Sequence, residues 1–144
     1  MKGSNLLLFC GCLLLLVVGC AATKSIAAGE ARKDVLYTCN CGDQCKCNSV
    51  STTPGNCKCG SPMKWGHLLK MEGNEALICQ CDEGCTCSLD PKDPSKCGCG
   101  KPVKRVNLAG SGLYFCNCGG ACKCNVISDQ PGECKCGMKL KQST

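Results

Sequence analysis

Residues 36–60 of the chain read LYTCNCGDQCKCNSVSTTPGNCKCG, and this stretch decides how the chain folds. It holds six cysteines as three C-x-C pairs, with the spacing C-x-C-x3-C-x-C-x9-C-x-C. In an extended segment residues i and i+2 face the same side, so the two sulfurs of a pair point the same way. Their Cβ atoms would then lie ~6.5 Å apart, whereas a disulfide needs ~3.8 Å. A metal ion ~2.3 Å from each sulfur tolerates that spacing better, so the pairs predict metal–thiolate ligation.

The same spacing occurs three times without exception, and the copies start 40 and then 37 residues apart. A fixed period with fixed internal spacing indicates one structural unit used three times. We therefore predict three metal-binding modules. The eighteen predicted metal ligands are Cys39, Cys41, Cys45, Cys47, Cys57, Cys59, Cys79, Cys81, Cys85, Cys87, Cys97, Cys99, Cys116, Cys118, Cys122, Cys124, Cys134 and Cys136.

The middle copy differs from the other two, which are identical at 17 of the 25 positions in 36–60 and 113–137. In copies one and three, lysine stands between the two cysteines of four pairs, at Lys46, Lys58, Lys123 and Lys135. An ammonium group beside a thiol lowers the thiol pKa and offsets the charge of a thiolate cluster; plain solvation of these lysines is the alternative. The middle copy has Gln80, Thr86 and Gly98 at corresponding Asn and Lys positions, so it is expected to bind metal differently.

The composition excludes an ordinary hydrophobic-core enzyme. The 144 residues include 21 cysteines, about 15%, but one Trp, two Tyr and two Phe, so sulfur must order the chain through disulfides or metal–thiolate bonds. The formal net charge of +6 counts every thiol as neutral, and eighteen thiolates would reverse its sign, so it does not indicate nucleic-acid binding. The sequence contains no Ser/His/Asp set, phosphate loop or paired carboxylates, and we expect no catalytic residues and no enzymatic activity.

The N-terminus indicates export. Lys2 precedes an apolar run of 13 residues, Leu6–Val18, which is too short for a membrane span of ~20 residues and typical of a signal peptide. The run ends at Val17-Val18-Gly19-Cys20-Ala21, which resembles the bacterial lipobox. This resemblance implies a lipid on Cys20 and a lipid-anchored membrane protein in the cell envelope, facing the periplasm or exterior. Ordinary cleavage near Ala21 or Ala28 is the alternative.

These patterns predict small cysteine-rich, metal-dominated modules, irregular with short β-hairpins and with little helix outside the signal segment. Two hairpins are expected between the arrays, one around the turn at 72–74 and one that joins 103–108 to 113–116 around 109–112. The predicted organisation is a lipoprotein-type signal peptide at 1–19, a flexible tether at 20–34, module 1 at 35–63, a hairpin linker at 64–75, module 2 at 76–102, a hairpin linker at 103–112, module 3 at 113–140 and a tail at 141–144.

Two other uses of the cysteines stay open. An exported chain with an even number of array cysteines is often a disulfide scaffold, which would make this an exported structural or adhesion protein without metal. Iron–sulfur electron transfer is disfavoured, because cluster motifs usually have two to four residues between their ligands, whereas each pair here has one. Sulfur ligation selects Zn(II) or Cu(I), with Cd(II) and Hg(II) as further candidates, and excludes Mg and Ca.

The third copy resembles the bacterial heavy-metal-binding domain. It has Tyr114-Phe115-Cys116 and then Pro131-Gly132-Glu133-Cys134-Lys135-Cys136-Gly137-Met138-Lys139-Leu140, and the first copy repeats much of this match. The family closes with C-x-x-C where this chain has C-x-C, and the extra C-x-C-x3-C-x-C is similar to metallothioneins. The resemblance implies heavy-metal binding and a metal-efflux protein as a partner.

Residues outside the arrays receive lesser roles. His67, the chain's one histidine, is expected to face solvent or to pack rather than to ligate metal. Met63 and Met138 are expected to fill gaps beside the clusters. Small separate apolar patches are expected under the sites, from Leu36, Tyr37, Ile78, Tyr114 and Phe115.

Overall fold

The computed structural model describes residues 32–42, 45–118 and 123–144. In this part of the chain the secondary structure is short antiparallel strands without helix, which confirms the predicted class of small cysteine-rich β modules. The predicted signal peptide, Cys20, the tether up to residue 31 and Cys122 lie outside the described residues. The described strands are β1 (Val35–Thr38), β2 (Val50–Ser51), β3 (Lys64–Glu72), β4 (Glu75–Cys79), β5 (Val103–Asn107), β6 (Tyr114–Phe115), β7 (Ile127–Ser128) and β8 (Lys141–Gln142).

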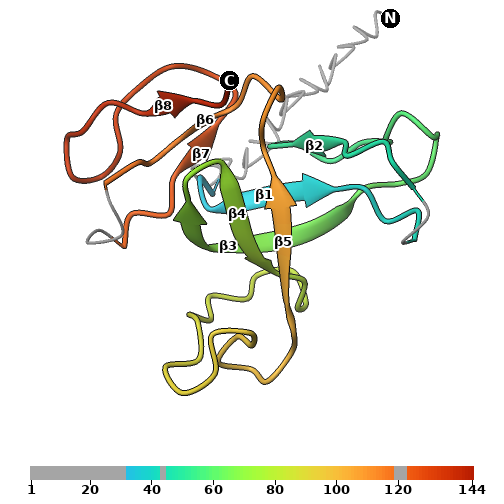
Figure 1. Ribbon diagram of the computed structural model, residues 1–144, viewed down its shortest axis with the longest axis horizontal. Helices are drawn as coiled ribbons and strands as arrows, with labels where there is room; N and C mark the ends of the chain where they lie inside the picture. Colours follow the sequence, from blue (N-terminus) through green and yellow to red (C-terminus); the bar gives the residue numbers. More distant parts are fainter. Residues whose placement is uncertain (1–31, 43–44, 119–122) are drawn as a thin grey trace, which may run out of the picture. The chain divides into compact units, whose positions relative to one another are not determined.

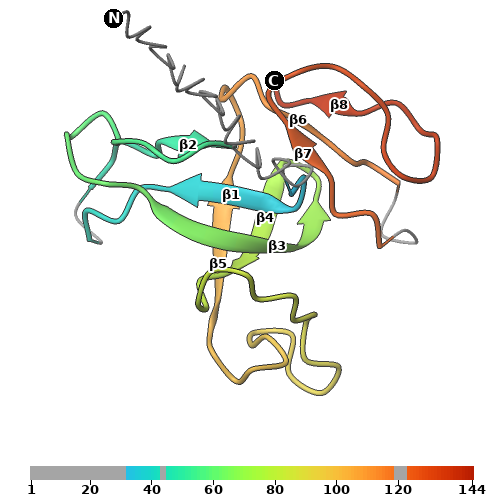
Figure 2. The same ribbon diagram turned by 180° about the vertical axis from the view of Figure 1, so that it is seen from behind.

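The strands form two antiparallel sheets. One has five strands in the order β2-β1-β3-β4-β5, and the other has three in the order β7-β6-β8. Figure 1 shows β4 and β5 in front of β1 and β3, and the reverse view in Figure 2 shows β1 and β3, the longest strand, in front. Within these elements, no described helix is long and apolar enough to cross a membrane.

The sequence repeat reappears as a repeat of strand pairing. Each array leaves the end of one strand and returns into a strand that pairs with it: β1 with β3, β4 with β5, and β6 with β8. The register is the same in all three modules, because the residue just before the first array cysteine always faces a lysine. These pairs are Thr38 with Lys64, Ile78 with Lys104, and Phe115 with Lys141. One structural unit is therefore used three times, and in Figure 1 the β4–β5 connection, coloured olive to amber, extends away from the sheet.

The segments between the arrays supply the return strands rather than simple connectors. The hairpin expected around 72–74 forms, since β3 and β4 pair on either side of Gly73 and Asn74. The hairpin expected over 103–116 does not form, because β5 pairs with β4 while β6 pairs with β7 and β8. The apolar pattern of 103–108 indicated a strand but carried no information on which strand would be its partner.

The apolar residues expected to form separate patches under the sites contribute instead to one shared core, while two smaller clusters lie at the cysteines of modules 2 and 3. Leu36, Ile78 and Phe115 come from three different modules and belong to a single buried cluster. Tyr37 and Tyr114 are half-buried and outside it. The other members of the cluster are Leu68, Ala76, Val106, Leu108, Leu113 and Ile127. The three modules are thus held together by burial of apolar surface, which the low apolar content did not suggest.

Candidate metal centres

Each array closes in the same tight hairpin. In module 1, Gly60 N donates to Cys57 O at 2.8 Å and Cys57 N donates to Ser61 O at 2.9 Å. Gly60 has a φ of 82°, and its counterparts Gly100 and Gly137 have 81° and 79° with the same two hydrogen bonds. A turn followed by a residue in the left-handed region is a three-residue hairpin loop, and glycine enters that region without steric cost. The motif C-x-C-G is therefore a folded knuckle in all three modules.

The knuckle brings the two sulfurs of a pair together. Cys97 Sγ lies 2.7 Å from Cys99 Sγ, and Cys134 Sγ lies 2.9 Å from Cys136 Sγ. The opening pairs converge as well, with 3.0 Å between Cys39 Sγ and Cys41 Sγ. The prediction of extended pairs is wrong, because turns bend the backbone at the cysteines. Four sulfurs around a tetrahedral ion, each at ~2.3 Å from it, lie about 3.8 Å apart. The converged pairs are closer to this separation than extended pairs would be, so they are better placed to bind one ion.

All six cysteines of module 1 meet in two overlapping groups, within each of which the sulfur atoms lie within 4.8 Å of one another. Cys41 Sγ is 3.1 Å from Cys57 Sγ, and Cys45 Sγ is 3.2 Å from Cys59 Sγ. One group is Cys39, Cys41, Cys47 and Cys57, and the other is Cys41, Cys45, Cys47 and Cys59. Each group has the four sulfurs of a tetrahedral site, and the two groups share Cys41 and Cys47.

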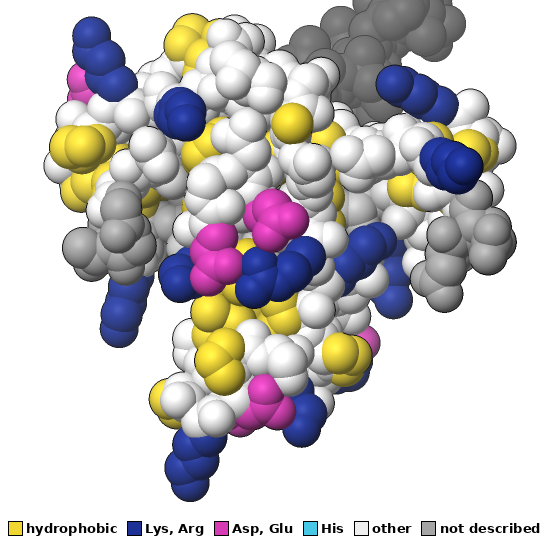
Figure 3. All heavy atoms as spheres, viewed as in Figure 1, with side chains coloured by type: hydrophobic (Ala, Val, Ile, Leu, Met, Phe, Trp, Pro, Cys, Tyr) yellow, Lys and Arg dark blue, Asp and Glu magenta, His cyan; other side chains and the backbone are white. Residues whose placement is uncertain are grey.

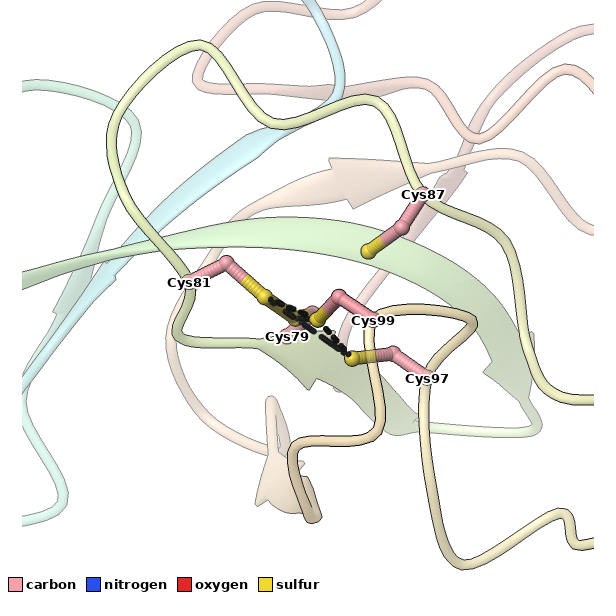
Figure 4. A group of neighbouring side chains, drawn as sticks. All are labelled: Cys79, Cys81, Cys87, Cys97 and Cys99. Atoms are coloured by element: carbon pink, nitrogen blue, oxygen red, sulfur yellow. Dashed lines mark hydrogen bonds between the residues drawn. A yellow bond between two sulfur atoms is a disulfide. The ribbon is translucent and has the colours of Figure 1, made fainter.

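Module 2 places five sulfurs together, on the side of the sheet away from the shared core. These are Cys79, Cys81, Cys87, Cys97 and Cys99, drawn in Figure 4. Cys81 Sγ is 2.7 Å from Cys99 Sγ, and Cys79 Sγ is 3.0 Å from Cys97 Sγ. Cys79 and Cys97 are fully buried beside Leu69 of β3 and Val103 of β5, and these apolar side chains close one side of the group.

A disulfide joins Cys79 to Cys81 in this module. An extended C-x-C pair would hold its two sulfurs too far apart for a disulfide. The chain instead turns as it leaves β4, and the two Cα atoms lie 5.6 Å apart, a separation within the range that disulfides span. Metal binding at all five sulfurs therefore requires this bond to be reduced first.

A second group in module 2 contains a nitrogen. One ring nitrogen of His67 and the sulfurs of Cys85 and Cys87 lie within 4.8 Å of one another. His67 is 5% exposed, so the solvent-facing position considered in the sequence analysis is wrong. Burial lowers the pKa of His67, which favours the neutral, metal-binding imidazole despite Asp34 at 3.1 Å. The sequence carried no signal for this position, because only the β3–β4 register places His67 opposite the first cysteine of an array.

Module 3 brings the sulfurs of its first and last pairs together, as module 1 does, but differs from it in a disulfide. Cys116, Cys118 and Cys134 form a three-sulfur group, and Cys136 Sγ is 3.1 Å from Cys118 Sγ. Cys124 is buried in the same cluster as Cys116 and Cys134, and is disulfide-bonded. The predicted ligands of this module that the structure describes are therefore neighbours.

The clusters hold thiols and thiolates side by side. In module 1 a hydrogen bond from the Ser49 hydroxyl lowers the pKa of Cys47 to about 5, while the neighbouring Cys41 thiol raises the pKa of Cys39 above its usual range. In module 3 the Cys136 thiol lowers the pKa of Cys134 to about 6. A cation that enters such a group replaces shared protons, because metal ligation requires the deprotonated sulfur.

The lysines inside the C-x-C pairs and the two methionines near the clusters were also given expected roles. The four lysines inside the C-x-C pairs, Lys46, Lys58, Lys123 and Lys135, are all exposed. Met138 is 54% exposed, so it does not fill a gap beside its cluster as expected, while Met63 is half-buried. Figure 3 shows lysine and arginine side chains spread over the visible face, several next to carboxylates, rather than gathered into one basic patch.

The chain is a cysteine-rich protein with clustered cysteine groups that can bind metal ions, and the comparisons add no family to this description. No protein-family model matches the sequence, and neither a curated protein nor a solved structure matches it.

Proposed function

We propose that this protein binds soft or borderline metal ions through its cysteine thiolates and sequesters or buffers them at the cell envelope, without catalysis. The observation that carries the proposal is the convergence of cysteine sulfurs from distant parts of each array into groups within 4.8 Å. Sulfur ligands favour Zn(II) or Cu(I), with Cd(II) as a further candidate. The resemblance of the first and third arrays to the bacterial heavy-metal-binding domain supports the same function and suggests a metal-efflux protein as partner.

The overlap of the two groups in module 1 supports a cluster of two divalent ions. Two tetrahedral ions need eight ligands, and six sulfurs suffice when two of them bridge. Cys41 and Cys47, which belong to both groups, are the natural bridges. Three such clusters would hold about six divalent ions per chain, or about twelve Cu(I) ions at four per cluster, by the ligand counts of thiolate sites.

The envelope location rests on the N-terminal sequence. The apolar run and the Val18-Gly19-Cys20 segment support export and attachment to a membrane through a lipid on Cys20. A protein attached there would meet metal ions before they reach the cell interior. No nucleic acid is needed as a partner in this proposal.

A disulfide-rich exported structural or adhesion protein is the second candidate, and the Cys79–Cys81 disulfide favours it. Against it, the sulfurs of Cys41 and Cys57, and of Cys45 and Cys59, lie about 3 Å apart as free thiols. Free thiols at such distances are what metal ligation would use, and disulfides would consume them.

The test is native mass spectrometry of the full mature chain, purified from its own host, with thiol titration before and after chelation. Metal ions that leave on chelation while the titratable thiols rise would support the proposal. Cysteines that do not titrate as thiols either before or after chelation would overturn it in favour of the disulfide scaffold. The variant Cys41→Ser tests the bridges, with Cys39→Ser as the matched control from the same pair. Loss of two ions in the first and of at most one in the second is expected.

A further inference from the structure

His67 is buried with half of its hydrogen-bonding capacity unused. Its Nε2 atom lies 3.1 Å from Asp34 Oδ2, whereas Nδ1 has no hydrogen-bond partner among the described residues. His67 is 5% exposed, so water has little access to the ring. Buried polar atoms in proteins are nearly always paired, and an unpaired one points to a ligand that is bound under other conditions.

The ring lies on the face of β3 that carries the module 2 cysteines. Alternate residues of a strand face opposite sides, and Leu68 belongs to the shared core while Leu69 packs with Cys79 and Cys97. His67 is directly opposite Cys79 in the β3–β4 register. The strand pairing therefore fixes the imidazole beside an array that lies twelve or more residues further along the chain.

Arg32 ties the ring and the cysteine loop into one network. Its guanidinium donates two hydrogen bonds of 2.9 Å to the Asp34 carboxylate and one of 3.0 Å to the carbonyl oxygen of Cys85. It also lies over the Trp65 ring, 5.6 Å from the centroid. Asp34 is thus held in place to orient His67, and the same cation holds the backbone of Cys85 close to both.

We propose that His67 Nδ1 and the Cys85 and Cys87 sulfurs form a mixed nitrogen–sulfur metal site, with Asp34 orienting the imidazole through Nε2. This rests on the proposed metal-binding function and specifies the site and ion of the middle module. A carboxylate that accepts the second ring N–H is the usual support of a metal-bound histidine. One imidazole and two thiolates suit Zn(II), and Cd(II) as its analogue.

Cys87 links this site to the five-sulfur group. It belongs to both groups, and Figure 4 shows it to one side of the other four sulfurs. Two tetrahedral ions need eight ligand positions, and the seven protein ligands of module 2 fill them when one sulfur bridges the two ions. The imidazole brings no charge, which suits an array that has Thr86 and Gly98 at the positions where the other two arrays have lysine.

The test uses the full, reduced chain labelled with ¹⁵N-histidine, in which His67 is the one labelled ring. After loading with ¹¹³Cd(II), the Nδ1 signal should shift and show coupling to ¹¹³Cd. In parallel, His67→Gln should retain one divalent ion fewer than the wild type in the presence of a chelator. Asp34→Asn should lower the affinity for that ion by about 10–100-fold. Lys70→Gln, in the same strand and paired with Glu72 outside this network, is the control and should retain every ion.

The outcomes separate the two proposals. Cysteine groups that fill with Cd(II) while the ring nitrogens stay unchanged would overturn the nitrogen–sulfur site and leave the proposed function standing. A reduced chain that takes up no metal would overturn both. Because the ¹⁵N measurement uses the wild-type sequence, a variant that fails to fold does not affect this result.

Discussion

The Ile78 side chain lies directly over Gly66: a Cβ atom at Gly66 would stand 2.7 Å from Ile78 Cδ1 and 3.3 Å from the carbonyl oxygen of Leu36. Gly66 is in β3, and the two residues it meets come from the neighbouring strands β4 and β1. Both Leu36 and Ile78 are fully buried. The absence of a side chain at Gly66 is therefore a condition for the close packing of modules 1 and 2.

Replacing Gly66 with Ala should destabilise the fold. The added methyl group must displace Ile78 in a filled core, and overpacking of this kind costs about 1–3 kcal/mol. Urea unfolding of the reduced, metal-free chain, followed by the fluorescence of the buried Trp65, measures the change. Gly55→Ala is the control, because nothing lies within 4 Å of that position. Equal stability of the two variants would argue against a tightly packed core.

Removal of metal should leave the sheet folded while the arrays lose their order. The low apolar content indicated that sulfur must order the chain, which would then lose its order throughout when metal is removed. The shared cluster around Leu68 and Ile78 now supplies one, so amide signals of β3 and β4 should stay dispersed after chelation under reducing conditions. Signals of the array residues should collapse and return when metal is restored. Loss of dispersion throughout would show that sulfur ligation alone orders the chain.

Gly60→Ala should weaken metal binding by module 1. Gly60 adopts a φ of 82°, and an L residue in the left-handed region costs about 1–2 kcal/mol. The strain falls on the knuckle that presents Cys57 and Cys59, so the affinity should fall by about tenfold per 1.4 kcal/mol transferred to binding. Chelator competition measures this, again with Gly55→Ala as the control. An unchanged affinity would mean that the knuckle forms without its left-handed residue.

Ser49→Ala should shift the thiolate titration of the metal-free, reduced protein to higher pH. The Ser49 hydroxyl lies 3.5 Å from Cys47 Sγ and lowers the pKa of Cys47 to about 5, so Cys47 is a thiolate at neutral pH. Without this hydrogen bond the pKa of Cys47 rises toward its ordinary value, and less thiolate is present at pH values between the two. Thiolate absorbance measured against pH tests this, with Ser51→Ala as the control because its hydroxyl contacts Thr53. Coincident curves for all three proteins would rule out the assigned role of Ser49.

Cys20→Ser should release the protein from membranes. If Cys20 carries the lipid, the variant appears in the soluble envelope fraction or the medium, while the wild type needs detergent for extraction. Fractionation of cells that express each form gives the answer. A wild type that is soluble without detergent would contradict the lipid anchor.

The repeat and the clustering of the array cysteines were predictable because they depend on local spacing, whereas the turned conformation of each C-x-C pair was not. Fixed C-x-C pairs followed by Gly60, Gly100 and Gly137 give the same knuckle wherever they occur. The shared core was not predictable, because Leu36 and Phe115 are distant in sequence and meet only through strand pairing. The same holds for His67, whose neighbours Asp34 and Cys85 lie on either side of it in the chain and are brought together by the sheet and by Arg32. Spacing identifies ligands within a motif, but long-range pairing decides which outside residue joins them.

The common register of the three modules has a consequence for how the protein can be cut. Each array is a loop whose two ends are anchored in paired strands, such as β4 and β5. A protease that nicks a single array would leave both halves attached through the sheet, and the other two loops would keep their geometry. A cut inside β3 would instead separate module 1 from the rest, since β3 pairs with both β1 and β4. Peptides that each contain a single array therefore lack the strand neighbours that shape the intact protein, and the loops are the replaceable part of the molecule.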